Sequence, residues 1–153
     1  REQARRQYNF AIKREPMFVP ALYRLALLAQ ADNLLGVALG YYARTLSIEP
    51  DHLRAKGRLE ATVLELKKQP IEKQVLAYEK AIKIEEQFSL GYEELGELKA
   101  KLKKWDEAIA AYRKLARLKR RSSKINQKIQ LWRAEKLKSE AQPKPGATPS
   151  PKK

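Results

Sequence analysis

The feature that most constrains the fold of this chain is an internal repeat. Four ten-residue segments line up, and the tyrosines in their second positions are 34, 36 and 34 residues apart. Between these segments, apolar residues recur at i, i+3, i+4 and i+7, which is the period of an amphipathic helix. One short helical hairpin cannot bury its apolar stripe alone, so repeats of this kind stack into a continuous core. The sequence therefore predicts stacked helical hairpins, with the aligned segments at 7–16 (Tyr8), 41–50 (Tyr42), 77–86 (Tyr78) and 111–120 (Tyr112).

The unit at 89–122 carries a recognisable order of residues. Tyr92 comes first, followed by Leu95-Gly96, then Trp105-Asp106-Glu107-Ala108, and then Tyr112. In this order the chain resembles the tetratricopeptide repeat family, whose unit is a helix–turn–helix of about 34 residues. The resemblance covers about residues 1–122. It implies an all-α, antiparallel helix-hairpin solenoid, to which a C-terminal capping helix and a disordered tail would be added.

The resemblance also divides the chain. The unit at 53–88 lacks the first aromatic residue and has two additional residues, which we place in the turn around Gln69-Pro70. The last twelve residues include four prolines and no large apolar side chain, so we expect them to be disordered. The expected parts are the second helix of a truncated repeat at 1–18, repeats at 19–52, 53–88 and 89–122, a basic capping helix at 123–141 and the tail at 142–153.

Prolines and capping residues mark the expected helix ends. Pro16 and Pro50 should stop helices. The following helices should be capped by the side chains of Asp51, Ser89 and Asp106.

The N-terminal helix has no first helix of its repeat to pack against. The chain begins with Arg1 and not with Met, partway through a repeat, so we expect it to be part of a longer array. Without a preceding helix, apolar side chains at Tyr8, Phe10 and Ile12 would be exposed. This exposure predicts self-association of the N-terminal end.

The charge of the chain is concentrated near its C-terminus. Of the net +15, residues 1–97 contribute +1, residues 98–141 contribute +11 and the tail adds three lysines. Two structures are open for the basic part. Either the chain turns at Ser122-Ser123, and a separate helix covers the last repeat with Ile125, Ile129 and Trp132, or one helix runs unbroken over 106–140. We favour the turn, because serines cap helices well and the repeat requires a turn there.

The residues that carry catalysis or bind metals are scarce. The chain has no cysteine and one histidine, His52, so a metal or redox site is not expected. Gly36 and Gly40 lie in a helical pattern without the strand and the Lys-Ser/Thr of a phosphate loop, and we assign them to close helix packing. No apolar run reaches the ~18 residues that a membrane span needs. The sequence predicts a protein that is not an enzyme and holds no cofactor.

In the family that the chain resembles, the first helix of each hairpin lines a concave groove. By this resemblance the groove is basic at one end and acidic at the other, so a peptide or partner helix of matching dipolar charge is the expected ligand. One type of family member clamps an acidic C-terminal carboxylate with Lys, Asn and Arg side chains, and none of its five positions matches here. The groove residues are Tyr23, Arg24, Leu27, Arg54, Arg58, Ala61, Glu65, Glu93, Glu94 and Glu97.

The basic part offers an alternative function, which is binding of RNA, DNA or an anionic surface. Neutralised phosphates would supply affinity, but no aromatic stacking platform is interleaved with the basic side chains. We assign Trp132 to the capping helix, where it would cover the last repeat, and not to base stacking. We therefore expect another protein or peptide as the partner, with nucleic acid as the alternative. The candidate polyanion patch is Lys114, Arg117, Lys119, Arg120, Arg121, Lys124 and Lys128.

Overall fold

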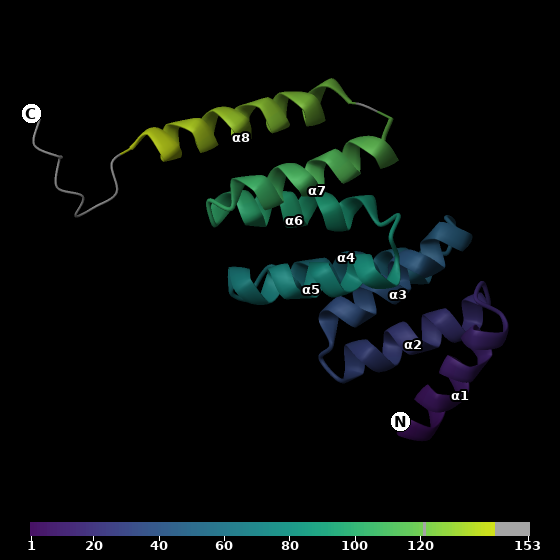
Figure 1. Ribbon diagram of the computed structural model, residues 1–153. Coiled ribbons are helices and arrows are strands. Elements are labelled where there is room, and N and C mark those ends of the chain that lie inside the picture. Colours follow the sequence, from purple (N-terminus) through teal and green to yellow (C-terminus); the bar gives the residue numbers. More distant parts are fainter. Residues whose placement is uncertain (121, 143–153) are drawn as a thin grey trace, which may run out of the picture.

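The fold is a stack of α-helices, as the sequence predicts. The computed structural model describes residues 1–120 and 122–142, and these ranges contain eight helices and no strand. Figure 1 shows the helices following one another from the N-terminal end of the stack to the C-terminal end. The helices are α1 (Glu2–Arg14), α2 (Val19–Ala31), α3 (Leu35–Ile48), α4 (Leu53–Leu66), α5 (Ile71–Ile84), α6 (Ser89–Lys101), α7 (Trp105–Leu118) and α8 (Ser123–Ala141).

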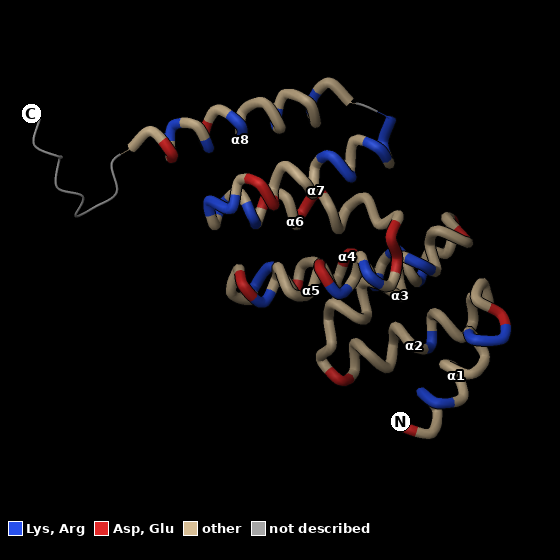
Figure 2. Tube along the Cα trace, viewed as in Figure 1, with Lys and Arg blue, Asp and Glu red and all other residues tan. Residues whose placement is uncertain are grey.

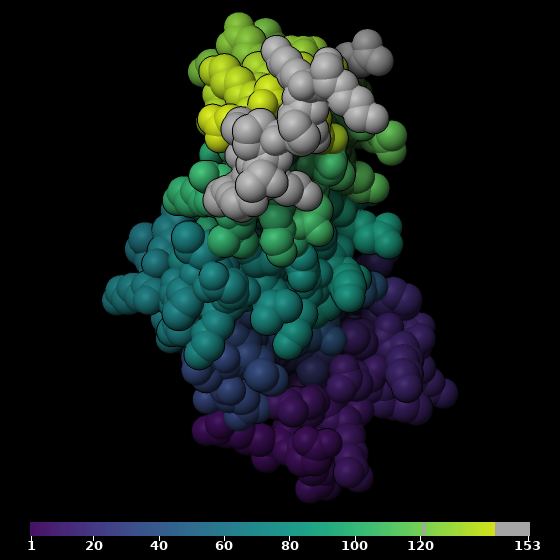
Figure 3. Space-filling model, turned by 60° about the vertical axis from the view of Figure 1, so that its left-hand side comes forward, coloured from purple at the N-terminus to yellow at the C-terminus, as the bar shows by residue number. Residues whose placement is uncertain are grey.

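The helices pair into three hairpins, α2–α3, α4–α5 and α6–α7, with α1 at one end of the stack and α8 at the other (Figure 3). This repeat array is consistent with the tetratricopeptide-like solenoid that the sequence predicts. Pro16 and Pro50 each follow a helix end by two residues, as expected for helix stops. The tail at 143–153 lies outside the described residues.

Helix α1 contributes little to the core. It has no buried residue, and the side chain of Phe10 is 60% exposed. The guanidinium of Arg14 lies over the Phe10 ring, 5.2 Å from its centroid. Tyr8 and Ile12 are half-buried. The predicted self-association of this end remains a prediction.

The prediction that three side chains cap helices is wrong. Asp51 precedes the N-cap of α4, Ser89 is the first residue of α6, and Asp106 is the second residue of α7. Helix α4 is capped instead by His52, whose Nδ1 accepts a hydrogen bond from the backbone N–H of Ala55 at 3.1 Å. The N-cap positions of α6 and α7 are occupied instead by Phe88 and Lys104, whose side chains make no capping hydrogen bond.

Three tyrosines from equivalent positions of α3, α5 and α7 form the centre of the core. Tyr42, Tyr78 and Tyr112 are all buried, so they are core residues. The Tyr42 hydroxyl donates a hydrogen bond to Gln30 at 2.7 Å, and burial raises the pKa of Tyr42 to about 12. The Tyr78 hydroxyl has no partner in the described part of the chain, and burial raises its pKa.

Pairs of small residues let two of the hairpins close tightly. In the α2–α3 hairpin these residues are Ala26 and Ala38, and both are fully buried. The equivalent residues in the α6–α7 hairpin are Gly96 and Ala108, and a Cβ on Gly96 would lie 3.4 Å from the Ala108 carbonyl oxygen. Small side chains at facing positions allow helix backbones to approach, so these two hairpins pack closely.

The middle hairpin, α4–α5, differs. Glu60 and Gln74 occupy the positions that are small in the other hairpins, and the backbones of α4 and α5 remain farther apart. The Gln74 amide is used in the turn, where its Nε2 donates to the Gln69 carbonyl at 2.7 Å. Compared with the first complete repeat, one of the two additional residues lengthens α4 to fourteen residues. The other lengthens the turn between α4 and α5, which spans 67–70, to four residues.

In compensation, α3 packs directly on α5. A Cβ on Gly36 would lie 2.5 Å from the Ala77 carbonyl oxygen, and a Cβ on Gly40 would lie 2.7 Å from the Ile84 Cβ. The assignment of both glycines to close helix packing is confirmed. Within the described ranges, neither α1 and α3 nor α5 and α7 approach in this way.

The chain turns between α7 and α8, so the alternative of one unbroken helix over 106–140 is wrong. Ile125, Ile129 and Trp132 are buried, and the Trp132 ring meets the Tyr112 ring edge-on at 4.5 Å between centroids. Arg120 takes the place of Pro16 and Pro50 in this turn and has a φ of 47°. Proline is held near −65° and cannot adopt that angle. Arginine at this position therefore permits a different turn.

Candidate functional site

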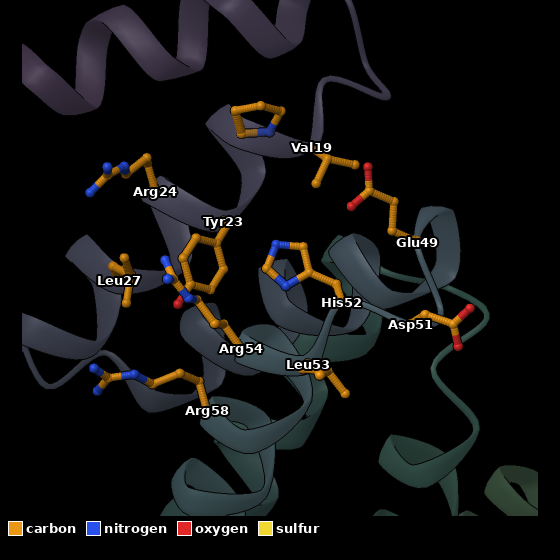
Figure 4. A pocket seen from close by; sticks show the side chains of 11 residues that line it. Val19, Tyr23, Arg24, Leu27, Glu49, Asp51, His52, Leu53, Arg54 and Arg58 are labelled. Atoms are coloured by element: carbon orange, nitrogen blue, oxygen red, sulfur yellow. The ribbon is translucent and has the colours of Figure 1, made fainter.

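A cleft of about 730 Å³ lies between α2 and α4, beside the turns that join successive hairpins (Figure 4). It brings together five of the ten predicted groove residues from two repeats. Tyr23, Arg24 and Leu27 come from α2, and Arg54 and Arg58 come from α4. The remaining lining residues are Val19, Pro20, Glu49, Asp51, His52 and Leu53.

The floor of the cleft is formed by fixed aromatic rings. The Tyr23 ring lies 4.9 Å from the His52 ring and 6.0 Å from the Tyr42 ring, centroid to centroid. His52 is held in place because its Nδ1 caps α4. The ring on which a ligand would rest is therefore positioned by the packing of two hairpins, and its side-chain entropy is already lost before any ligand binds.

The basic side chains of this cleft have no internal partners. Arg24, Arg54 and Arg58 are exposed, and within the described residues none of them lies within 4.0 Å of a carboxylate oxygen. In Figure 4 the carboxylates of Glu49 and Asp51 lie beyond His52, away from Arg24 and Arg58. The part of the cleft around Tyr23 and Leu27 is therefore positively charged and uncompensated.

An exposed apolar stripe continues the cleft along α4. Leu53 is 80% exposed and Leu64 is 64% exposed, and Gly57 and Ala61 lie between them on the same face of the helix. A Cβ on Gly57 would meet nothing within 4 Å. The sequence analysis missed Leu53, Gly57 and Leu64, although the spacing i, i+4, i+8 and i+11 could have indicated the stripe.

The acidic end of the predicted groove is neutralised by lysines from other helices. Glu93 pairs with Lys119 at 3.6 Å and Glu97 with Lys128 at 3.1 Å. Glu94 pairs with Lys67 at 3.5 Å. Glu65, the fourth acidic residue of the set, is exposed. Three of the four predicted acidic groove residues therefore have a cationic partner, whereas the arginines at the other end have no anionic partner in the part of the chain that the structure describes.

A second hollow of about 310 Å³ joins α6, α7 and α8. The Tyr112 hydroxyl in it donates to Glu97 Oε1 at 2.7 Å, and burial together with this bond raises the pKa of Tyr112. Lys119, Lys124 and Lys128 line the same hollow. Three of the four lysines of the candidate polyanion patch thus share a site with Glu93 and Glu97.

The remaining patch residues do not join that hollow. Lys114 and Arg117 of α7 are not among its lining residues, whereas Lys119, the C-cap residue of α7, is one of them. Arg120 is exposed in the following turn. Arg121 lies outside the described residues. Of the six patch residues that the structure describes, three therefore line this hollow and three do not.

Other kinds of site were sought in residues 1–120 and 122–142. No three His, Asp or Glu side chains there come together as metal ligands would. Over the same ranges, every helix is too short or too polar to cross a bilayer.

Comparison with known proteins gives likenesses in structure alone. No protein-family model matches the sequence, and no curated protein matches it. The crystal structure of the MamA protein superimposes with a TM-score of 0.45 and 22% identity over 90% of this chain and 74% of that one. The TPR domain of Sgt2 from Aspergillus fumigatus gives 0.45 and 17% over 88% and 90%. The Arabidopsis OM64 TPR domain gives 0.43 and 16% over 76% and 94%.

Proposed function

We propose that this protein is an interaction scaffold that holds an acidic segment of a partner protein in the cleft between α2 and α4. The observation that carries the proposal is an imbalance of charge along the groove. Among the described residues, Arg24, Arg54 and Arg58 surround Tyr23 without an anionic partner, while three groove glutamates are paired with lysines. The expected ligand is therefore acidic and not dipolar.

The side chains of the cleft suit a peptide. A guanidinium offers a planar fork of donors that binds a carboxylate through two parallel hydrogen bonds. Arg54 and Arg58 are one turn apart on α4, so they can bind carboxylates one turn apart on a helical ligand. The exposed stripe from Leu53 to Leu64 would take the apolar side chains of the same segment, as in other complexes of an amphipathic helix with a groove.

The proposal is tested with a fluorescein-labelled amphipathic peptide that carries glutamates one turn apart beside leucines. Binding is measured by fluorescence anisotropy on the wild type and on a variant with Arg54→Glu and Arg58→Glu. We expect at least a tenfold weaker affinity in the variant, roughly what two lost charged contacts supply. A matched variant with Lys119→Glu and Arg120→Glu should bind the peptide almost as the wild type does.

Two outcomes would contradict this function. One is an equal loss of affinity in both variants, which would show a general charge effect. The other is tighter binding of a labelled single-stranded RNA than of the peptide at about 0.15 M salt, lost only with Lys119→Glu and Arg120→Glu. That result would establish the polyanion alternative.

A further inference from the structure

A separate apolar notch of about 250 Å³ opens between α3 and α5, beside the turns within the hairpins. Leu34, Val37 and Leu76 form its walls, and Gly36 and Ala77 form its floor, where the two helices touch. Leu34 is 42% exposed and Leu76 is 57% exposed. The notch shares no lining residue with the α2–α4 cleft. It is therefore an independent surface.

The notch depends on a position at which α5 differs from α3 and α7. Leu76 occupies the position that is Gly40 in α3 and Ala110 in α7. Of these three helices, α5 alone has a large apolar side chain at this position. The direct contact of α3 with α5 brings this leucine beside Val37 and Leu34. The two exposed leucines thus belong to one concave apolar surface and are not scattered singly, which is the arrangement that marks interaction sites.

The charges around the notch indicate what would cover it. Lys73 and Lys80 line it on α5, one turn before and one turn after Leu76. Over the described ranges, neither ammonium lies within 4.0 Å of a carboxylate. At 1.5 Å per residue the two lysines are separated by roughly 10 Å along the helix. An occupant that neutralises both must carry two negative charges about two helical turns apart, with an apolar group between them.

We propose that this notch is a second docking site, and that its ligand is an amphipathic helix of a partner protein in which two carboxylates seven residues apart flank a pair of apolar side chains. Such a helix would lie along α5. Its carboxylates would reach Lys73 and Lys80, and its apolar pair would enter between Leu34 and Leu76. The proposal goes beyond the function argued for the cleft, because a scaffold with two sites can hold two partner segments at once or one partner at two points.

The size and lining favour a side-chain anchor over other ligands. Small-molecule sites usually exceed about 300 Å³, and this notch is smaller and open. Two lysines give too little charge for a nucleic-acid footprint, in which several phosphates are neutralised. A helix-in-groove complex needs only a few apolar anchors at i, i+3 and i+4 with a charged rim.

The test uses the full chain with ¹³C-labelled Leu and Val methyl groups and a capped helical peptide of about 18 residues, long enough to be helical. The peptide carries the two leucines and the two glutamates in the stated register. We expect saturable shifts of the Leu34, Val37 and Leu76 methyl signals. Leu76→Ala, which copies Ala110 and so should fold, should weaken binding about tenfold, as loss of a central anchor does.

A charge exchange makes the test specific. A variant with Lys73→Glu and Lys80→Glu should lose the glutamate peptide and bind a peptide in which lysines replace the glutamates. The variant with Arg54→Glu and Arg58→Glu, which removes charge from the α2–α4 cleft, should keep the shifts at the notch.

Three outcomes would overturn the notch proposal. The first is the absence of saturable shifts at peptide concentrations up to about 1 mM, the weak limit of useful affinity. The second is a response confined to the Leu53 and Leu64 methyls, which would place the peptide in the cleft alone and leave the function proposed there intact. The third is a shift of the notch signals that grows with protein concentration without peptide, which would make a second copy of the chain the occupant.

Discussion

Replacing Gly36 by alanine tests the direct packing of α3 on α5, on which the notch depends. The new Cβ would lie 2.5 Å from the Ala77 carbonyl oxygen and 2.6 Å from the Ala77 Cα, whereas nonbonded heavy atoms prefer about 3.5–4.0 Å. The opposing atoms belong to the backbone and cannot rotate away, so the helices must separate by roughly 1 Å. Overpacking of this kind costs about 3 kcal/mol at the upper end of its usual range.

Alanine also favours the helix over glycine by about 1 kcal/mol, so the net loss for Gly36→Ala is about 2 kcal/mol. Gly57→Ala is the matched control, because nothing lies within 4 Å of its Cβ and only the helix preference remains, a gain of about 1 kcal/mol. In a chain of this size each kcal/mol shifts Tm by about 2–4 °C. Thermal unfolding followed by circular dichroism should therefore show a lower Tm for Gly36→Ala and a higher one for Gly57→Ala.

The reasoning is refuted if Gly36→Ala is as stable as the wild type, because α3 and α5 would then not be in contact at this point. A loss of stability in Gly57→Ala would show that the face of α4 assigned to ligand binding is covered by another part of the protein.

Two further predictions concern buried polar groups, and both are checked by urea unfolding. Tyr78→Phe removes a buried hydroxyl that has no hydrogen-bond partner among the described residues, so it should leave stability unchanged or raise it by up to about 1 kcal/mol. Tyr112→Phe breaks a hydrogen bond to a carboxylate and should cost about 1–2 kcal/mol. Equal effects of the two substitutions would contradict the assigned partners. Lys99 is buried between Glu79 and Glu107 at 3.1 Å from each. Lys99→Met should therefore cost less than about 1 kcal/mol. Glu79→Gln with Glu107→Gln should cost more, about 1–2 kcal/mol, because it leaves a buried cation unpaired while both carboxylates are partly exposed to solvent. The reverse order would refute this account.

The architecture could be predicted because it depends on residues that repeat. The tyrosine spacing gave the register of the hairpins, and Ile125, Ile129 and Trp132 could be assigned to the cap because they continue the apolar pattern past the last repeat. The role of Gly36 was predictable from a different signal, because a glycine inside a helical pattern indicates the close approach of another backbone.

The charge of the groove could not be predicted in the same way. Glu93 and Glu97 look like free carboxylates in the sequence, but their lysine partners are more than twenty residues away, Lys119 at the C-cap of α7 and Lys128 on α8. Which surface charges find partners is decided by the tertiary fold and not by local pattern. The capping of α4 by His52 escaped prediction for a related reason, because it depends on the geometry of one turn.

The departures from regular repetition gather in the middle hairpin, and both proposed sites border it. Glu60 and Gln74 replace the small residues that close the other hairpins, and Leu76 replaces a small residue on the outer side of α5. On the same two helices, the large apolar side chains of Leu53, Leu64 and Leu76 are exposed. Sequence positions that break the local packing rule without a gain in burial are expected at functional surfaces. Because α3–α5 contact replaces α4–α5 contact, the stack keeps its core while α4 and α5 present one apolar surface each. The irregular repeat would thus be the physical basis for the scaffold with two separate docking sites that we propose.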